Sequence, residues 1–162
     1  NFRVANHLEN QKIILGVASV WDKRKGFDDF IKLSEMLDNS YSIVLVGVSE
    51  KQKRHLPDRI IGITRTNNTA QLAEIYTAAD VFVNPTYEDN YPTVNLEAQA
   101  CGTPVITYNT GGSSESVNLE AVIEKGNIAE IICAVKRIHD FKASVLDDKI
   151  GQYKKCLTLY IG

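Results

Sequence analysis

Short apolar runs alternate regularly along this chain with segments of helical periodicity, and few folds are compatible with this pattern. Short, nearly continuous apolar runs are typical of strands that are buried on both faces of a sheet. Strands that alternate with helices along a chain indicate a parallel sheet. The runs that predict strands are Lys12–Ser19, Tyr41–Val48, Ile60–Thr64, Val81–Thr86, Thr103–Asn109 and a weaker sixth, Ala121–Gly126.

The segments between these runs carry helix signals. In the first of them, apolar residues recur at positions 27, 30, 31, 33, 36 and 37, which fits the period of a helix. Another has Pro92 near its first turn and Gly102 just past its end, the asymmetry expected of helix termini. The predicted helices are Phe27–Leu37, Ser49–Leu56, Thr69–Asp80, Pro92–Gly102 and Asn127–Ile138, and a polar tail of helical character follows them.

This order of elements predicts an α/β fold. Because crossovers between parallel strands are right-handed, the helices cover both faces, which gives a Rossmann-like doubly wound parallel sheet of about six strands. The 162 residues suffice for one compact domain with its own core. Open parallel sheets bind ligands at the carboxyl ends of their strands, so we expect the site in the loops that follow the strands.

Composition narrows the classes of function. A net charge of -2 gives no reason to expect nucleic acid as a partner. No apolar run approaches the roughly 18–20 residues of a membrane-spanning helix. The cysteines, Cys101, Cys133 and Cys156, are odd in number and widely spaced, which predicts reduced thiols in a cytoplasmic protein. The histidines are scattered without metal-like partners, so we predict no metal site.

The stretch Asn84–Gly112 carries three acidic residues, Glu88, Asp89 and Glu97, and no lysine or arginine. Glu88 and Asp89 follow the fourth predicted strand, just before a predicted helix start. A helix start offers free N–H groups and the positive end of the helix dipole, which suit phosphate or sugar hydroxyls. Glu97 lies about one turn further on, where its carboxylate could accept two hydrogen bonds from a vicinal diol such as ribose. The alternative is that these acids only complement the helix dipole.

Three motifs in this region resemble a known family. The stretches D-N-Y-P-T-V-N-L-E-A, C-G-T-P-V-I and T-G-G-S-S-E follow one another between Asp89 and Glu115. Together they look like the retaining glycosyltransferases of the GT-B fold, in the large family-four group (glycosyl transferases group 1). That family has an E-x(7)-E motif, and Asp89 and Glu97 have the same separation. Asp89 then stands in place of the first glutamate, with Glu88 directly before it, and either acid could do its work.

The resemblance also implies roles for other loops. The loop S-V-W-D-K-R-K-G-F after the first strand would hold the donor diphosphate, although the usual G-R dipeptide before it is missing. The loop after the third strand would lie near the nucleotide base, and the glycines of T-G-G-S-S-E near the acceptor. The alternatives are a solvated basic turn, a polar loop and simple turn glycines. The implied donor-binding residues are Arg24, Lys25, Thr64, Arg65, Asn90, Tyr91, Pro92, Thr93 and Glu97, and the catalytic candidates are Asp89, Glu88 and Glu97.

The reaction implied by the resemblance is transfer of a sugar from a nucleotide diphosphate sugar to an acceptor hydroxyl, with retention at the anomeric carbon. Arg24, Lys25 and the helix start at Asn90–Thr93 would stabilise the leaving diphosphate. Glu97 would hold the ribose diol, and Asp89 or Glu88 would contact the donor sugar. This scheme needs neither a metal nor another cofactor. Bacterial polysaccharide or glycolipid synthesis is the expected setting.

The opening segment N-F-R-V-A-N-H-L-E-N-Q-K-I-I-L-G resembles the linker that enters the second domain of GT-B enzymes. Residues 1–162 are therefore expected to be a single donor-binding, carboxyl-terminal domain, with the amino-terminal acceptor domain absent from this chain. The fragment alone would bind nucleotide without transferring sugar. The acceptor, a glycan or a lipid-linked sugar, would be bound through the other domain, and the full-length enzyme would contact the inner face of the membrane peripherally.

Two other classes of function fit parts of the pattern. A GT-B-shaped epimerase or phosphorylase half would share the fold and a similar nucleotide or phosphate site, and would differ in its products. A non-enzymatic regulatory α/β module, such as a receiver, would share only the fold class. A receiver needs an acidic cluster after the first strand, whereas this chain has Lys23, Arg24 and Lys25 there.

Overall fold

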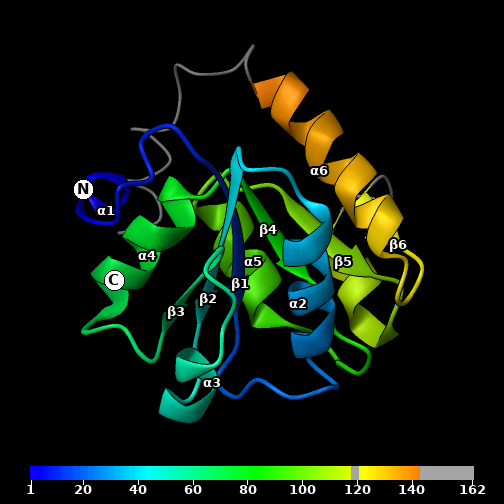
Figure 1. The fold of residues 1–162 in the computed structure, drawn as a ribbon. Helices are drawn as coiled ribbons and strands as arrows, with labels where there is room; N and C mark the ends of the chain where they lie inside the picture. Colours follow the sequence, from blue (N-terminus) through cyan, green and yellow to red (C-terminus); the bar gives the residue numbers. More distant parts are fainter. Residues whose placement is uncertain (118–120, 143–162) are drawn as a thin grey trace.

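The computed structural model describes residues 1–117 and 121–142 and shows an α/β fold with one central sheet (Figure 1). Six strands, all parallel to their neighbours, form the sheet in the order β3-β2-β1-β4-β5-β6. The predicted Rossmann-like sheet of six strands is therefore confirmed. The strands are β1 (Lys12–Val17), β2 (Tyr41–Val46), β3 (Ile60–Ile63), β4 (Val81–Asn84), β5 (Val105–Tyr108) and β6 (Val122–Ile123).

All the predicted helices are present, and each begins or ends within a few residues of its expected position. They are α2 (Phe27–Met36), α3 (Glu50–Arg54), α4 (Thr69–Ala78), α5 (Thr93–Ala100) and α6 (Ile128–Lys142). A short helix, α1 (Phe2–Ala5), was not predicted, and a 3-10 helix, η1 (Gly111–Ser116), lies where the glycine-rich turn after the fifth strand indicated a short helix. The helical tail predicted after residue 138 lies outside the described residues from position 143 onward.

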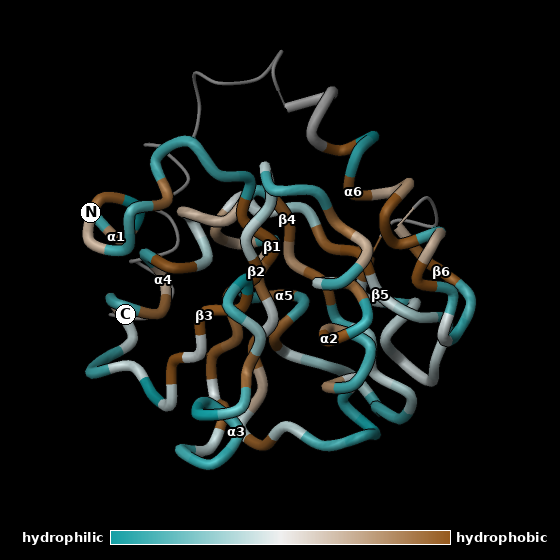
Figure 2. Tube along the Cα trace, in the orientation of Figure 1, coloured by the Kyte–Doolittle hydropathy of each residue, from teal (hydrophilic) through white to brown (hydrophobic). Residues whose placement is uncertain are grey.

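The sheet separates two apolar cores, as the alternation of side chains along a strand requires. In β1, Ile14 belongs to the core that contains residues of α2 and α6, whereas Ile13 and Leu15 belong to the core that contains residues of α4 and α5. Helices thus cover both faces, and Figure 2 shows the hydrophobic strands running between them. Among the described residues, no helix is long and apolar enough to cross a membrane.

The strand order reverses direction between β1 and β4. From β1 the chain moves outward through β2 to β3, then returns to β4 on the other side of β1 and continues to β5 and β6. At such a switch point, the loops after the two central strands diverge and leave room for a ligand. The loop after β1 holds Lys23, Arg24 and Lys25, and the loop after β4 holds Glu88 and Asp89.

The prediction of reduced thiols holds for one described cysteine only. Cys133 of α6 is a free and exposed thiol. Cys101, which follows α5 and is buried, is disulfide-bonded, so the prediction is wrong for that residue.

Candidate functional site

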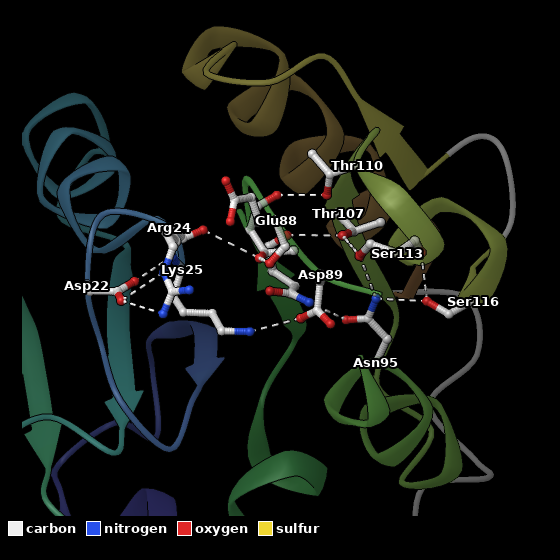
Figure 3. Close-up of polar contacts among 12 residues, drawn as sticks. Asp22, Arg24, Lys25, Glu88, Asp89, Asn95, Thr107, Thr110, Ser113 and Ser116 are labelled. Carbon is white, nitrogen blue, oxygen red and sulfur yellow. Dashed lines mark hydrogen bonds and ion pairs between the residues drawn. The ribbon is translucent and has the colours of Figure 1, made fainter. Parts of the chain in front are cut away.

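The basic loop after β1 and the acidic loop after β4 meet in an ion pair. The Lys25 ammonium lies 2.9 Å from Oδ2 of Asp89, and the two side chains are 35% and 17% exposed (Figure 3). Sequence reasoning placed both residues at the site, and the fold brings them together because β1 and β4 are adjacent at the switch point. A partly buried pair of this kind is screened less by salt than a pair on the open surface.

Asp22 organises the basic loop from within. One carboxylate oxygen accepts the backbone N–H of Lys25 at 3.1 Å, and the other accepts two hydrogen bonds from the Arg24 guanidinium at 3.2 Å. The Lys25 N–H is the largest of the effects that lower the pKa of Asp22, and the Arg24 side chain adds to it. The Arg24 side chain is 68% exposed and remains accessible to a ligand.

Backbone contacts fix the two loops against each other. The N–H of Tyr87 donates to the carbonyl of Arg24 at 2.7 Å. Gly26 adopts a left-handed φ of 79°, and a Cβ at this position would lie 2.2 Å from the carbonyl oxygen of Pro85. Only glycine combines this conformation with so close an approach. The K-G pair at the end of the loop therefore sets the distance between the basic and acidic groups.

The glycines after β5 support the acidic loop from its other side. Gly112 donates its N–H to the carbonyl of Asp89 at 3.2 Å, and Gly111 has a left-handed φ of 44°. Thr110 adds a hydrogen bond of 2.8 Å from its hydroxyl to the carbonyl of Thr86 (Figure 3). These residues do more than turn the chain, because they contact the backbone of the loop that carries both acids.

A buried polar network lies beneath the acidic loop, and sequence reasoning missed it. The Asn95 side chain, 0% exposed in α5, accepts from Asn84 at 2.9 Å and donates to Ser116 at 2.8 Å and to Ser113 at 3.2 Å. Thr107 connects Ser113 to the end of β4. A satisfied buried network of this kind fixes side chains in one arrangement. Its sequence signal was weak: one asparagine at the end of a buried strand and another inside a helix.

Helix α5 begins at Thr93 with its first N–H groups uncapped by any side chain. Pro92 occupies the N-cap position, and the first turn contains no acidic residue. The first backbone N–H groups of a helix have no partner within the helix and can bind an anion. Around this start, Asn90, Tyr91 and Thr93 are exposed, whereas Pro92 is buried and has no N–H to donate.

The remaining predicted residues fall in three places. Glu88 is exposed next to Asp89, and Glu97 is partly buried on α5, where it accepts a hydrogen bond of 2.9 Å from the hydroxyl of Tyr76. Thr64 and Arg65 follow β3, which β2 separates from β1. They therefore lie at the same edge of the sheet as Lys25, but two strands away from its loop.

Behind the loops lies a second unpredicted cluster. Asp29 lies in the first turn of α2 and is only 5% exposed, although aspartate side chains normally lie on the surface. Its Oδ2 accepts the hydroxyl of Tyr87 at 2.5 Å and that of Tyr108 at 2.7 Å. Burial, and then the hydrogen bond to Asp29, raises the pKa of Tyr87 to about 12, and the same causes raise the pKa of Tyr108.

This cluster predicts a loss of stability at alkaline pH. Tyrosines of the unfolded chain lose their protons from about pH 10, whereas Tyr87 keeps its proton in the fold up to about pH 12. The unfolded state then binds fewer protons, so the free energy of unfolding should fall as pH rises from 10 through 12. Urea unfolding at pH 8 to 11 should show a shallower fall for Tyr87→Phe than for the wild type. An exposed-tyrosine control, Tyr91→Phe, should keep the wild-type slope, and equal slopes in all three proteins would contradict the prediction.

The fold is one that solved glycosyltransferases share. A structure of sucrose-phosphate synthase from Thermosynechococcus elongatus superposes with a TM-score of 0.74 at 24% identity, covering 98% of this chain and 44% of that chain. The Anabaena protein HepE in complex with UDP-glucose gives a TM-score of 0.72 at 17% identity, covering 96% of this chain and 44% of that chain. These similarities show that the chain has the Rossmann-like architecture found in GT-B proteins.

The sequence identifies the family. The profile described as Glycosyl transferases group 1 matches residues 1–155, so this chain belongs to that family. It is 31% identical over 129 residues to an alpha-galactosylglucosyldiacylglycerol synthase of Streptococcus pneumoniae, and this match covers 74% of the chain. It is 33% identical over 82 residues, 43% of the chain, to a D-inositol 3-phosphate glycosyltransferase of Actinosynnema mirum. The chain spans only 32% and 20% of the lengths of these two relatives.

Proposed function

We propose that this chain is the donor-binding domain of a retaining glycosyltransferase that uses a nucleotide diphosphate sugar. The observation that carries the proposal is the convergence, at the switch point of the sheet, of the Lys25–Asp89 pair with the uncapped start of α5. A diphosphate needs positive charge and free N–H donors, and both are available there. Family membership and the UDP-glucose complex of one structural relative support this assignment.

In this mechanism the protein stabilises the charge that develops on the leaving diphosphate. Lys25 would exchange its contact with Asp89 for the phosphate oxygens, and the exposed Arg24 would add a bidentate grip. The N–H groups at the start of α5 would complete a preorganised electrostatic site. Thr64 and Arg65 would lie towards the nucleotide base, and Glu97 would accept hydrogen bonds from the ribose.

We assign the role of the first acid to Asp89 rather than to Glu88. Asp89 is largely buried, has its carboxylate on Lys25, and is supported by Gly112 through its carbonyl. Glu88 is exposed, and among the described residues its side chain has no hydrogen bond or ion pair. A catalytic group must be held in place near the reacting atoms, and only Asp89 meets that requirement.

The proposal also includes the acceptor, but only its general class. An acceptor-binding domain would face this edge of the sheet, as in two-domain GT-B enzymes. The name of the Streptococcus pneumoniae relative refers to a glycosyl diacylglycerol, which favours a lipid-linked acceptor at the cytoplasmic face of a membrane.

The reaction products would distinguish sugar transfer from epimerase or phosphorylase chemistry. Among the described residues, no group of three or more His, Cys, Asp or Glu could hold a metal ion, and the proposal uses no metal.

A thermal-shift panel with UDP, GDP, ADP and dTDP tests the donor site. A ligand at 100 times its dissociation constant stabilises the folded state by about 2.7 kcal/mol. For a domain of this size that is on the order of 5–10 °C in the unfolding temperature. We expect one diphosphate to give such a shift and Glu97→Ala to reduce it strongly. If no diphosphate shifts the unfolding of the chain, the proposal of a donor site formed by this domain is wrong.

A further inference from the structure

A buried tyrosine contacts the carboxylate to which the proposed function assigns the ribose. Tyr76 lies in α4 and is 0% exposed. Its hydroxyl donates a hydrogen bond of 2.9 Å to Oε2 of Glu97 in the neighbouring helix α5. Within the described part of the chain, this is the one hydrogen bond that the Glu97 side chain makes. The orientation of the Glu97 carboxylate therefore depends on the position of Tyr76, a residue that a bound nucleotide sugar would not touch.

The Tyr76 hydroxyl is a fixed point in the fold. The ring packs against Phe82 of β4, with centroids 5.6 Å apart. The backbone carbonyl of Tyr76 also accepts a hydrogen bond from the buried hydroxyl of Thr103 at 2.5 Å. A ring enclosed in this way has little freedom to change rotamer, because the interior is closely packed. The hydroxyl that donates to Glu97 is thus held in place on α4 by the contacts of Tyr76 with β4 and with the segment before β5.

A fixed donor matters because of how a carboxylate recognises a diol. Two hydroxyls on neighbouring carbons are bound well only when the plane of the carboxylate matches them. A glutamate side chain has several rotatable bonds, and ordering it during binding costs conformational entropy. A carboxylate that is already oriented in the free protein avoids much of that cost, which is the general benefit of preorganisation.

The geometry points to Tyr76 as a positioning residue for ribose recognition. By holding Oε2 of Glu97, it orients the carboxylate so that the protein distinguishes a ribonucleoside diphosphate from the 2′-deoxy form. This inference rests on the proposed function, because it needs a nucleotide at the carboxyl edge of the sheet. It adds a specificity determinant in α4, outside the loops and the E-x(7)-E motif. Tyr76 acts only through Glu97 and takes no part in the chemical step.

Calorimetric titration with UDP, GDP and ADP, each paired with its 2′-deoxy form, tests this role. We expect the wild-type chain to bind one ribonucleotide and to bind its deoxy form about tenfold more weakly, the effect of one lost hydrogen bond to a charged group. Tyr76→Phe keeps the ring and removes the hydroxyl. It should weaken ribonucleotide binding by about tenfold and leave the deoxy form nearly unchanged, because only the diol contact depends on the oriented carboxylate.

Two further variants separate positioning from simple structural damage. Tyr41→Phe removes another buried tyrosine hydroxyl, at the start of β2 and thus at the opposite edge of the sheet, and should keep the wild-type discrimination. Glu97→Gln should remove the discrimination by itself, and adding Tyr76→Phe to it should change the affinities little further. Unfolding temperatures without ligand check that each variant is folded.

The outcomes separate the two proposals. If the wild-type chain binds no diphosphate, the proposed function is wrong and the role of Tyr76 falls with it. If the wild type prefers the ribonucleotide and Tyr76→Phe keeps that preference, the positioning role alone is wrong. If Tyr76→Phe weakens both forms equally, the tyrosine supports the fold and not the recognition of ribose, which also overturns the inference.

Discussion

Replacing Gly112 with alanine should destabilise the chain by about 3 kcal/mol and abolish nucleotide diphosphate binding. A Cβ at this position would lie 1.6 Å from the carbonyl oxygen of Asn90, 2.8 Å from its carbonyl carbon and 3.4 Å from Cα of Tyr91. All three are backbone atoms, so no change of rotamer can relieve the clash. The loop after β4 would have to move away from η1, and the hydrogen bond from Gly112 to Asp89 would be lost.

Urea unfolding and calorimetric titration measure these two effects. Ser114→Ala is a matched control in the same 3-10 helix, because the one hydrogen bond that its hydroxyl makes to a described residue is a long one, 3.5 Å to the carbonyl of Gly111. It should unfold like the wild type. If Gly112→Ala unfolded at the wild-type urea concentration and bound diphosphate normally, the close contact between this loop and the acidic loop would not exist in solution.

The close approach of the acidic loop explains why two glycines follow β5. Gly111 has a left-handed φ of 44°, and a Cβ there would lie 2.1 Å from the carbonyl oxygen of Asp89. Gly112 has no left-handed φ, and glycine is required there only because a Cβ would clash with the backbone of the acidic loop. The two glycines thus bring the backbone of one loop against the backbone of another. The acid that faces Lys25 is consequently held by main-chain contacts, which a side-chain substitution elsewhere would not loosen.

The sheet could be predicted from the sequence because every central strand is a short run of apolar residues. β2, for example, has five of its six residues buried. The strand order could not be read from the sequence, since the apolar runs do not say which strands are neighbours. Lys25 and Asp89 were placed at the correct edge of the sheet, but their pairing required β1 and β4 to be adjacent.

The missed parts of the candidate site are buried polar residues. Asp29 and Asn95 have side chains that normally lie on the surface, and in the sequence nothing distinguishes them from exposed neighbours such as Asp28. Their partners, Tyr87, Tyr108 and the serines of η1, come from other loops and strands. Such networks depend on contacts between distant segments. Local sequence patterns therefore predict which loops carry the exposed polar groups more easily than they predict the buried groups that hold those loops in place.

Lys25→Met and Asp89→Asn should change diphosphate affinity in opposite directions. Lys25→Met removes a charge-assisted contact to phosphate and leaves the Asp89 carboxylate uncompensated beside the incoming anion. We expect a loss of about 100-fold, which corresponds to about 2.7 kcal/mol. Asp89→Asn frees the Lys25 ammonium from its 2.9 Å ion pair and removes the repulsion, so the diphosphate should bind more tightly than to the wild type.

The double variant Lys25→Met/Asp89→Asn decides whether the two residues act on the ligand through each other. If the unpaired carboxylate causes part of the loss in Lys25→Met, the double variant should recover part of the affinity, and the two single effects should not add. In a longer protein that contains this domain and transfers sugar, Asp89→Asn should lower the transfer rate although its donor site binds the diphosphate more tightly. A weaker diphosphate affinity for Asp89→Asn would mean that Asp89 holds Lys25 in its binding position, and the proposed exchange of Asp89 for phosphate would then be wrong.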